Sequence, residues 1–510
     1  MSGALRALAA LTFAAAAVIV AAWAITYLTW PFGWDHGAFA WVGDVIVRGG
    51  MPYRDAFDVK GPMSFYPSAA VQLVSGRNWW GVRAFDLLLL LATAIVIGRI
   101  AARLSGRTAA AGAVLLWVLA YANTGFMNTA QPDAWIAWVM LLALAPILLR
   151  MGPATPALLA VAGAAAAVAT LLKPHYSAFL LLPLLVVWLE APERRARLAV
   201  PALAGFAAPI AAWLVLAVAT GTLGAFTEAV IRFNSAKNSS GLLGALTDSL
   251  SYGFLEDPVV LLALPLAAAG VPAVARLDRR AAMVLGGWLV LALPLILLQR
   301  PYYAYRLHIV TPALAILGAA AVARFSSPRE SGIEPDVGAT LAGALLLLGV
   351  VTFGRHPLGE IARGVGLLAG RRDPAAHYAR YDSWMASAAD ERRGARFIHD
   401  STPPGVTIFA WNHPAVAFLA DRRPAGRFLI ETPVSARLDE PLRASYLDSL
   451  HGGLSAAPPD VVVTEDTLGA AACLACLPPY AALGERGRVL AAPYRLRHRA
   501  GRLVIFTRTP

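Results

Sequence analysis

The sequence predicts a polytopic α-helical membrane protein with a small α/β domain at its C-terminal end. Of the 510 residues, 58% are hydrophobic and only 15% are charged, whereas soluble domains contain about 25% charged residues. The hydrophobic residues gather into about eleven apolar runs of near-membrane length. After residue 355 the pattern changes to short apolar runs separated by Arg, Pro and Asp.

The apolar runs predict the membrane-spanning helices. A helix needs roughly 20 residues to cross the hydrocarbon core, and the shorter runs can borrow flanking residues. The first run, about 25 residues long, exceeds the apolar core of a cleavable signal peptide, so we expect it to be retained. The runs lie near residues 6–30, 84–102, 108–122, 134–150, 154–172, 176–190, 198–220, 257–275, 281–298, 307–324 and 338–354.

Arginines predict the orientation of these helices, because every second loop contains them. Short arginine-rich loops stay in the cytoplasm, so we expect a cytoplasmic N-terminus and, with an odd helix count, an extracytoplasmic C-terminal segment. The net charge of +12 arises from these clusters. No basic stripe alternates with stacking aromatics, which excludes nucleic-acid binding. The loop arginines are Arg99, Arg103, Arg107, Arg150, Arg194, Arg195, Arg197, Arg276, Arg279, Arg280, Arg324 and Arg329.

The chain is therefore expected to contain two domains. Residues 1–354 form the transmembrane domain, including a first outer loop at residues 31–83, and residues 355–510 form the extracytoplasmic α/β domain. In the second domain VTIFAW (406–411), DVVVTE (460–465) and RLVIFT (502–507) predict buried strands, and residues 390–400 predict a helix. No Gly-rich phosphate loop opens a helix there, so nucleotide binding is unsupported.

The predicted outer loops contain most of the polar residues that could carry chemistry. Charged groups beside hydrocarbon are costly unless they serve a site or stay in water. We therefore predict the active site on the outer face. The residues concerned are Asp35, Asp55, Asp58, Lys60, Asp133, Lys173, His175, Arg300 and Arg306.

The first outer loop begins with a predicted amphipathic helix that lies along the membrane surface. Phe39, Val42, Val45 and Ile46 follow Asp35 at helical spacing. Asp35 would be the N-cap of this helix and Gly49-Gly50 would end it. A capping role alone is thus the alternative to a catalytic role for Asp35.

Two further features of this loop have competing interpretations. Asp44 and Arg48 are spaced as an i,i+4 pair and are expected on a solvated face. Lys60 precedes Gly61-Pro62, where a compact backbone lets the ammonium approach a phosphate. Snorkelling of Lys60 to lipid headgroups is the alternative.

The later outer loops contain the remaining candidates. Asp133 follows Pro132 at a helix entrance, where a carboxylate also favours the helix dipole. Lys173 and His175 form a tight polar turn in LLKPHYSAF, and Tyr305 and Arg306 belong to an aromatic and cationic cluster. Arginine in an outer loop runs against the positive-inside bias, which favours an anionic ligand. Near the C-terminus, Cys473 and Cys476 have C-x-x-C spacing, which leaves open two semi-buried residues or a local disulfide.

Five motifs resemble the bacterial members of glycosyltransferase family 39, relatives of protein O-mannosyltransferases and lipid A aminoarabinose transferases. The motifs are WDHGAF, MPYRDAFDVKGPM, TAQPDAW, LLKPHYSAF and RPYYAYRLHIVTPALA. The C-terminal stretch TPPGVTIFAWNHPAVAFLADRRPAGRF is similar to the exported domain of many of these enzymes. The resemblance implies the GT-C fold, a polyprenyl-phosphate sugar donor and action at the outer face of the cytoplasmic membrane.

The resemblance also implies roles for individual residues. Asp35 matches the general base, Asp133 the second acidic residue and Lys60 the loop lysine, although Lys-Gly-Pro replaces the Lys-Pro-Pro of many relatives. His36 follows Asp35 where a second acid would favour a tightly bound divalent metal. No cofactor is therefore predicted, and a divalent metal is an alternative. The expected substrate- or phosphate-binding residues are His36, Lys60, Lys173, His175, Tyr305 and Arg306.

Together these observations predict an inverting glycosyltransferase in the bacterial inner membrane. Its partners would be a polyprenyl-phosphate-linked sugar, a lipid, glycan or protein acceptor, and the bilayer. The alternatives are a transporter or flippase of lipid-linked sugars, a polysaccharide ligase or polymerase, and a non-enzymatic scaffold. Transporters place polar groups at the bilayer midplane, whereas the polar groups here fall in the outer loops.

Overall fold

The structure is a computed structural model, and its description covers most of the chain. It describes residues 3–150, 152–237, 258–297, 299, 303–325, 355–381, 387–430, 440–466 and 473–509, together with 244, 247, 344, 347–351, 438 and 469. The described chain divides into two compact units. Unit 1 contains residues 1–28, 84–213 and 240–364, and unit 2 contains residues 29–83, 214–239 and 365–510. Unit 2 thus combines the whole of the first predicted outer loop, residues 31–83, with residues 365–510 of the C-terminal segment.

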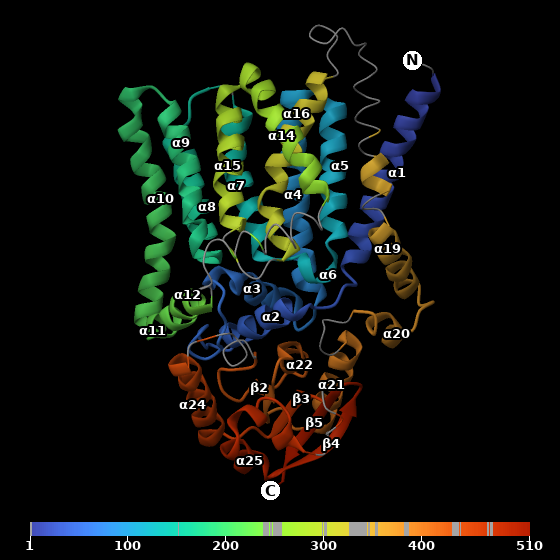
Figure 1. The fold of residues 1–510 in the computed structure, drawn as a ribbon, viewed down its shortest axis with the longest axis vertical. Helices are drawn as coiled ribbons and strands as arrows, with labels where there is room; N and C mark the ends of the chain where they lie inside the picture. The colour runs from blue at the N-terminus through green and yellow to red at the C-terminus, as the bar shows by residue number, and fades with distance from the viewer. Residues whose placement is uncertain are drawn as a thin grey trace. The chain divides into compact units, whose positions relative to one another are not determined.

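Unit 1 is a bundle of long apolar helices that run side by side (Figure 1). Its elements are α1 (Gly3–Tyr27), α4 (Trp80–Ser105), α5 (Arg107–Asn123), α6 (Gly125–Asn128), α7 (Pro132–Leu149), α8 (Pro156–Leu172), η2 (Pro174–Leu180), α9 (Leu181–Leu189), α10 (Pro192–Ala219), α14 (Pro258–Leu277), α15 (Arg279–Leu297), η5 (Ala304–Ile309), α16 (Thr311–Phe325) and α19 (Arg355–Leu368).

Helices occupy the predicted apolar runs from 6–30 to 307–324. Among the described residues, five helices are long and apolar enough to cross a membrane, namely α1, α4, α7, α10 and α15, and four shorter apolar helices accompany them. The last predicted run, 338–354, lies mostly outside the described residues.

Small residues let these helices approach closely. A Cβ at Gly163 in α8 would lie 2.0 Å from the carbonyl oxygen of Ala202 in α10, and one at Gly205 would lie 2.1 Å from that of Ala160. Gly270 makes the same kind of approach to Leu317 in α16. Helix association in membranes depends on such close backbone packing.

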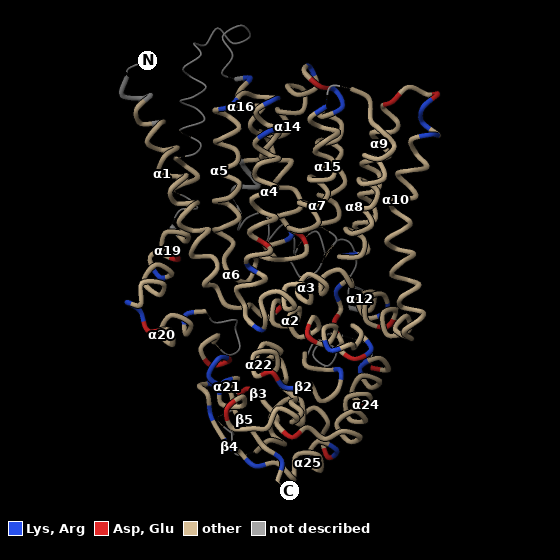
Figure 2. The backbone as a smooth tube through the Cα atoms, turned by 180° about the vertical axis from the view of Figure 1, so that it is seen from behind, with Lys and Arg blue, Asp and Glu red and all other residues tan. Residues whose placement is uncertain are grey.

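The arginine-rich loops of unit 1 meet at one end of the bundle. Arg103 donates a hydrogen bond to Asp278 at 2.6 Å, and Arg280 lies 2.9 Å from Glu190. Figure 2 shows the bundle helices largely free of charge along their middles, with Lys, Arg, Asp and Glu near their ends. The alternation of loops that the arginines indicated is therefore present in the fold.

Unit 2 contains the loop helices and a small α/β domain. Its elements are α2 (Trp34–Val47), η1 (Pro62–Ser64), α3 (Tyr66–Ser75), α11 (Leu223–Phe226), the π-helix η3 (Thr227–Arg232), α12 (Phe233–Lys237), α20 (Pro374–Tyr378), α21 (Ala388–Ser401), β1 (Thr407–Ala410), α22 (Pro414–Leu419), β2 (Arg423–Pro424), α24 (Glu440–Ala456), β3 (Val461–Glu465), η6 (Leu474–Cys476), η7 (Ala481–Leu483), α25 (Glu485–Ala491), β4 (Tyr494–Ala500) and β5 (Leu503–Arg508).

The five strands form one sheet in the order β2-β1-β3-β5-β4. Strand β1 pairs in parallel with β2 and β3, whereas β5 is antiparallel to β3 and β4. The three predicted strands correspond to β1, β3 and β5, and the predicted helix to α21, so these predictions are confirmed. The sequence did not predict β4, because its alternate arginines (YRLRHRA) hide the apolar pattern of a strand.

Helix α2 differs from the predicted amphipathic surface helix. Every residue from His36 to Val45 is buried, so the helix has no continuous polar face between those positions. Helix α2 packs against α3 on one side and α22 on another. The prediction was wrong because the partners of α2 come from distant parts of the chain, where a local pattern cannot reveal them.

Candidate active site

Asp35 lies in the first turn of α2 rather than at its N-cap. The N-cap is Gly33, and the amide of Gly33 donates a 2.9 Å hydrogen bond to Nδ1 of His36. His36 is buried, with 1% of its surface exposed. Asp35 is therefore not the N-cap that the sequence predicted, and it is the His36 side chain that accepts the amide hydrogen of the N-cap residue. The end of the helix was predicted correctly, since Gly49 follows Val47 and the C-cap Arg48 with a φ of +86°.

The carboxylate of Asp35 forms an ion pair with Lys60. Lys60 Nζ lies 2.8 Å from Asp35 Oδ1 and 3.7 Å from Asp58 Oδ1. The ammonium also faces the rings of Phe39 and Trp34, at 5.2 and 5.6 Å from their centroids. The side chains of Asp35 and Lys60 are 19% and 16% exposed, so the pair is accessible from solvent but largely enclosed.

The backbone that carries Lys60 is held from several sides. The hydroxyl of Tyr53 donates to the Lys60 carbonyl at 2.8 Å, and Asn234 Nδ2 donates to the Val59 carbonyl at 2.8 Å. The amide of Phe57 donates to the Arg427 carbonyl at 2.7 Å. Tyr53 is buried and has a φ of +67°, a strained conformation that only surrounding structure maintains. These contacts fix Lys60 near the start of α2.

Asp58 is the second carboxylate beside this lysine. Burial raises the pKa of the Asp58 carboxyl above its usual 3.8; the Lys60 ammonium acts in the opposite direction, and the Asp35 charge raises the pKa further. Its Oδ1 accepts a 3.0 Å hydrogen bond from the Lys60 amide. The Lys60 ammonium thus lies near two carboxylates, the partly exposed Asp35 and the fully buried Asp58.

Two glycines allow α2, the helix that contains Asp35, to pack closely against its neighbouring helices. A Cβ at Gly37 would lie 3.0 Å from the backbone nitrogen of Ala415 in α22, and a Cβ at Gly43 would lie 2.9 Å from that of Ala69 in α3. Gln72 reinforces the second contact by donating to the Ala40 carbonyl at 2.8 Å. The orientation of Asp35 therefore depends on both neighbouring helices.

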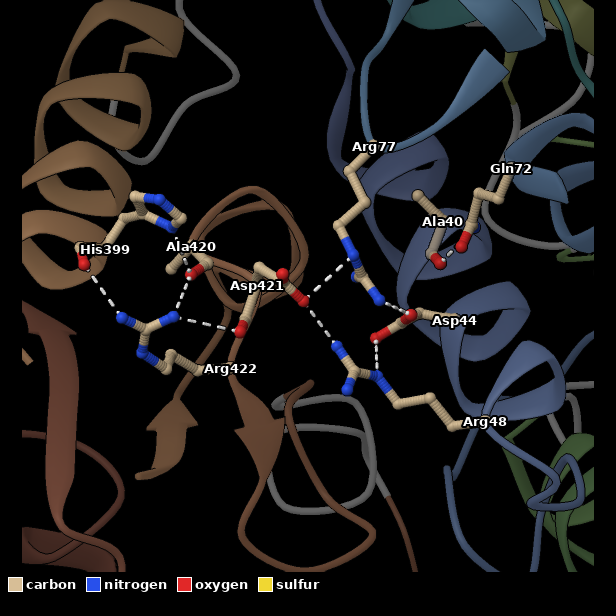
Figure 3. Close-up of polar contacts among 9 residues, drawn as sticks. All are labelled: Ala40, Asp44, Arg48, Gln72, Arg77, His399, Ala420, Asp421 and Arg422. Carbon is tan, nitrogen blue, oxygen red and sulfur yellow. Dashed lines mark hydrogen bonds and ion pairs between the residues drawn. The ribbon is translucent and has the colours of Figure 1, made fainter. Parts of the chain in front are cut away.

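A ring of four charges holds the C-terminal end of α2 (Figure 3). Asp44 bonds Arg48 at 2.9 Å and also bonds Arg77, and both arginines bond Asp421, at 2.6 and 3.0 Å. The Asp44 side chain is 2% exposed. The expectation of a solvated pair was therefore wrong, because Arg77 and Asp421, distant in the sequence, enclose it. Residues 29–83 and the α/β domain meet through this ring.

In unit 1 the second predicted acid also pairs with a predicted lysine. Lys173 Nζ lies 2.8 Å from Asp133 Oδ1 and 2.6 Å from Asp133 Oδ2. Lys173 also donates to Gln299 Oε1 at 3.2 Å, and Gln299 donates in turn to the Tyr176 hydroxyl at 2.9 Å. Asp133 is fully buried in the first turn of α7, after Pro132. Gln299 was not predicted as a site residue, since a lone amide at the end of an apolar run gives little signal.

Arg306 is a buried cation in the same unit. Only 5% of its surface is exposed, and neither Nε nor Nη1 has a hydrogen-bond partner among the described residues. Its guanidinium faces the ring of Tyr303 at 5.5 Å. The rings of Tyr303 and Tyr305 stack at 5.3 Å, and Lys173 faces Tyr305 at 5.4 Å. This cluster is suited to an anion, which would satisfy both guanidinium nitrogens.

Of the two remaining predicted residues of this region, only His175 is described by the structure. His175 is exposed, and its ring lies 4.5 Å from that of Tyr176. Arg300 lies outside the described residues. Within the described part of the chain, no group of three or more His, Cys, Asp and Glu side chains is arranged to hold a metal ion.

Asp86 is a buried carboxylate that the sequence analysis overlooked. It accepts hydrogen bonds from the hydroxyls of Tyr27 and Tyr121, both at 2.7 Å, and from Trp135 Nε1 at 2.8 Å. Tyr121 also accepts the amide hydrogen of Ala130 at 2.8 Å, where φ is +52°. These bonds position the start of α7 and hence Asp133. The available signal was a single aspartate inside an apolar run, which membrane proteins retain for a function or a partner.

The chain has the GT-C fold. Two solved structures of ArnT, a lipid A aminoarabinose transferase from Cupriavidus metallidurans, share it over 98% of this chain and 97% of theirs. The apo structure has a TM-score of 0.59 at 18% identity, and the structure bound to undecaprenyl phosphate has 0.60 at 19%.

An archaeal enzyme shows the same fold more distantly. The Archaeoglobus fulgidus oligosaccharyltransferase, tethered to an acceptor peptide, matches with a TM-score of 0.50 and 13% identity over 94% of this chain and 72% of its own. No family model and no curated protein matches the sequence. The comparisons therefore establish the fold class, with its long apolar helices and small C-terminal sheet.

Proposed function

We propose that this protein is an inverting membrane glycosyltransferase that uses a polyprenyl-phosphate-linked sugar. The observation that carries the proposal is the Asp35–Lys60 pair, which joins a base and a phosphate-binding cation at 2.8 Å. The GT-C fold supports it, since a solved structure with this fold contains undecaprenyl phosphate. Transfer would occur at the outer face of a bacterial inner membrane, with the N-terminus in the cytoplasm.

In the proposed reaction, the acceptor hydroxyl oxygen attacks the anomeric carbon of the sugar. The bond between that carbon and the phosphate oxygen breaks, and the electron pair leaves with the phosphate. Asp35 takes the proton of the acceptor hydroxyl. Attack opposite the leaving phosphate inverts the anomeric configuration. Lys60 is the cation proposed to bind the donor phosphate and its developing charge. Lys173 and Arg306 are the alternative candidates for this role.

The ion pair couples donor binding to the strength of the base. A lysine 2.8 Å from Asp35 favours the ionised carboxylate and so weakens it as a proton acceptor. When the donor phosphate attracts Lys60, Asp35 loses part of this stabilisation and becomes a stronger base. We therefore propose that Asp35 becomes fully effective only after the donor is bound, which would limit wasteful reactions of the free enzyme.

The other predicted residues contribute to different degrees in this proposal. Asp133 holds Lys173 rather than contacting the acceptor, because it is fully buried. His36 accepts the Gly33 amide hydrogen and so fixes the first turn of α2, which carries Asp35, while Tyr305 and His175 border the cation cluster. The Cys473–Cys476 disulfide supports an extracytoplasmic location for residues 355–510, because disulfides persist in oxidising compartments. Residues 1–354 would be the transmembrane part.

The proposal is tested with purified protein in nanodiscs and a panel of undecaprenyl-phosphate sugars. The expected result is release of carrier phosphate with at least one donor, and loss of release in Lys60→Ala. Asp55→Asn is a matched control, because Asp55 lies in the same loop but pairs with the exposed Arg54. Movement of intact donor across the bilayer without release would favour a flippase. Joining of preformed glycan blocks would favour a ligase or polymerase.

A further inference from the structure

The loop that contains Lys60 includes a carboxyl group that the proposed transfer does not use. Asp58 is fully buried, and its Oδ1 bonds the Lys60 amide at 3.0 Å. Its Oδ2 is also buried and has no hydrogen-bond partner among the described residues. An ionised carboxylate oxygen in this position is costly. Burial disfavours the charge of Asp58, and the Lys60 ammonium is the largest of the effects that favour it, ahead of the Lys60 and Val59 backbone amides.

Lys60 is the cation that faces Asp58, at 3.7 Å from Oδ1. The other titratable groups that interact with Asp58 are Asp35 and the hydroxyl of Tyr53. Asp35 is closer to Lys60, at 2.8 Å. One ammonium is thus shared between two carboxylates, and the more buried carboxylate has the weaker contact.

We infer that Asp58 binds a proton when the donor phosphate engages Lys60, so that donor binding and proton uptake are coupled at this carboxyl group. The inference rests on the proposed function, because it requires a phosphate at Lys60. The phosphate adds negative charge beside two carboxylates and draws the shared ammonium toward itself. Asp35 is partly exposed and can keep its charge with water, whereas Asp58 cannot.

The proton balance of this step is simple. The Asp58 carboxylate takes one proton from the buffer and becomes a neutral carboxyl group, and no other bond forms or breaks. The buried oxygen Oδ2 is the atom available for the proton, since Oδ1 accepts from the Lys60 amide. The direction of the Asp58 pKa shift agrees with this proton uptake, because burial already raises the pKa of Asp58 and the Lys60 charge opposes that rise. Movement of Lys60 toward a phosphate weakens the opposing effect.

A purely structural role for Asp58 makes a different prediction. In that case the residue only fixes the turn through the bond between Oδ1 and the Lys60 amide. Asp58→Asn separates the two roles, because the amide oxygen of asparagine can accept the same bond and cannot bind a proton in this pH range. The Asp55→Asn variant is the matched control for a lost carboxylate elsewhere in the loop.

The experiment measures binding of undecaprenyl phosphate to the full chain in nanodiscs by titration calorimetry. Binding is measured between pH 5 and pH 8 in buffers with different ionisation enthalpies, which yields the number of protons taken up. At some pH in this range the wild type should take up as much as about one proton more per carrier than Asp58→Asn. Titration of the carrier phosphate itself is common to both proteins and cancels in the comparison.

Equal proton uptake by the wild type and Asp58→Asn at every pH would overturn the inference and leave the proposed function intact. Failure of the wild type to bind any undecaprenyl phosphate would instead count against the proposed function. If Asp58→Asn does not fold, infrared difference spectra of the wild type decide the matter. Carrier binding should then produce the carbonyl band of a protonated carboxylic acid, and its absence across the pH series would refute the coupling.

Discussion

Lys60 Nζ lies 2.8 Å from Asp35 Oδ1, so the proposed base and the proposed phosphate-binding cation form one ion pair in the resting protein. Each group is therefore held by the other until the donor arrives. Binding and proton transfer should then respond differently when one partner is replaced.

Asp35→Asn should abolish sugar transfer while retaining carrier binding. Loss of a general base typically costs about 10²- to 10⁴-fold in rate, and Lys60 without its partner is free to bind phosphate. Transfer is measured as release of carrier phosphate, and binding by calorimetry with undecaprenyl phosphate. Asp55→Asn should change neither. Transfer at the wild-type rate by Asp35→Asn would disprove the assignment of the base.

The Asp133–Lys173 pair should behave as a buried ion pair in a double-mutant cycle. Lys173→Met leaves the fully buried Asp133 without its cation and should cost about 3–5 kcal/mol of unfolding free energy. Combining it with Asp133→Asn should recover most of that loss, because two neutral groups remain. Thermal unfolding in detergent reports both effects. Strictly additive losses would show that the pair is not coupled.

We expect Arg306 to lower the stability of the folded protein and to contribute to the binding of undecaprenyl phosphate. Its buried guanidinium has two nitrogens without a hydrogen-bond partner among the described residues, and such desolvation is unfavourable. Arg306→Met should therefore unfold at the same temperature or a higher one, while affinity for undecaprenyl phosphate falls about ten- to a hundredfold. An unchanged affinity would remove Arg306 from the candidates for binding the donor phosphate.

Gly37→Ala should perturb the presentation of Asp35. The added Cβ would lie 3.0 Å from the backbone nitrogen of Ala415, and such overpacking costs about 1–3 kcal/mol. The turnover number should fall more than carrier affinity, because α2 moves and Lys60 lies on another segment. Gly318→Ala in α16 is the control, since no atom lies within 4 Å of its new Cβ. A larger fall in carrier affinity than in turnover would contradict this view of α2.

Asp58 should make the stability of the folded protein depend on pH. Its pKa is raised in the folded protein, so the folded state binds more protons than the unfolded state at pH values between 3.8 and the folded pKa. Stability should therefore fall as pH rises through this window and level off above it. Asp58→Asn should lack this contribution. Thermal unfolding of both proteins from pH 4 to pH 8 measures the difference, and parallel curves would contradict the raised pKa.

The sequence predicted the helices, three strands and the candidate residues better than it predicted their partners. Apolar length and arginine-rich loops are local properties, and they identified most described helices and the common end of the arginine loops. Asp35 and Lys60 were both named, yet their pairing was not, because 25 positions separate them and the tight turn at Lys60 depends on Asn234 and Arg427.

The errors have the same origin. Asp44 and Arg48 have the spacing of a solvated pair, and the burial of Asp44 depends on Arg77 and Asp421, which complete the ring of charges. Helix α2 appeared amphipathic because α22, which covers part of it, lies nearly 380 positions later. Asp86 was overlooked because its three donors come from three other helices. Each case involves burial created by distant segments.

Unit 2 is assembled from three separate stretches of the chain, residues 29–83, 214–239 and 365–510. Helix α2 is made early in translation, but Ala415 and Asp421 emerge only after the last bundle helices have been synthesised. In a ribosome-bound chain that has just inserted its membrane helices, α2 and Asp35 therefore still lack the contacts that Ala415 and Asp421 provide. The enzyme proposed here would acquire its active geometry only near the end of its own synthesis.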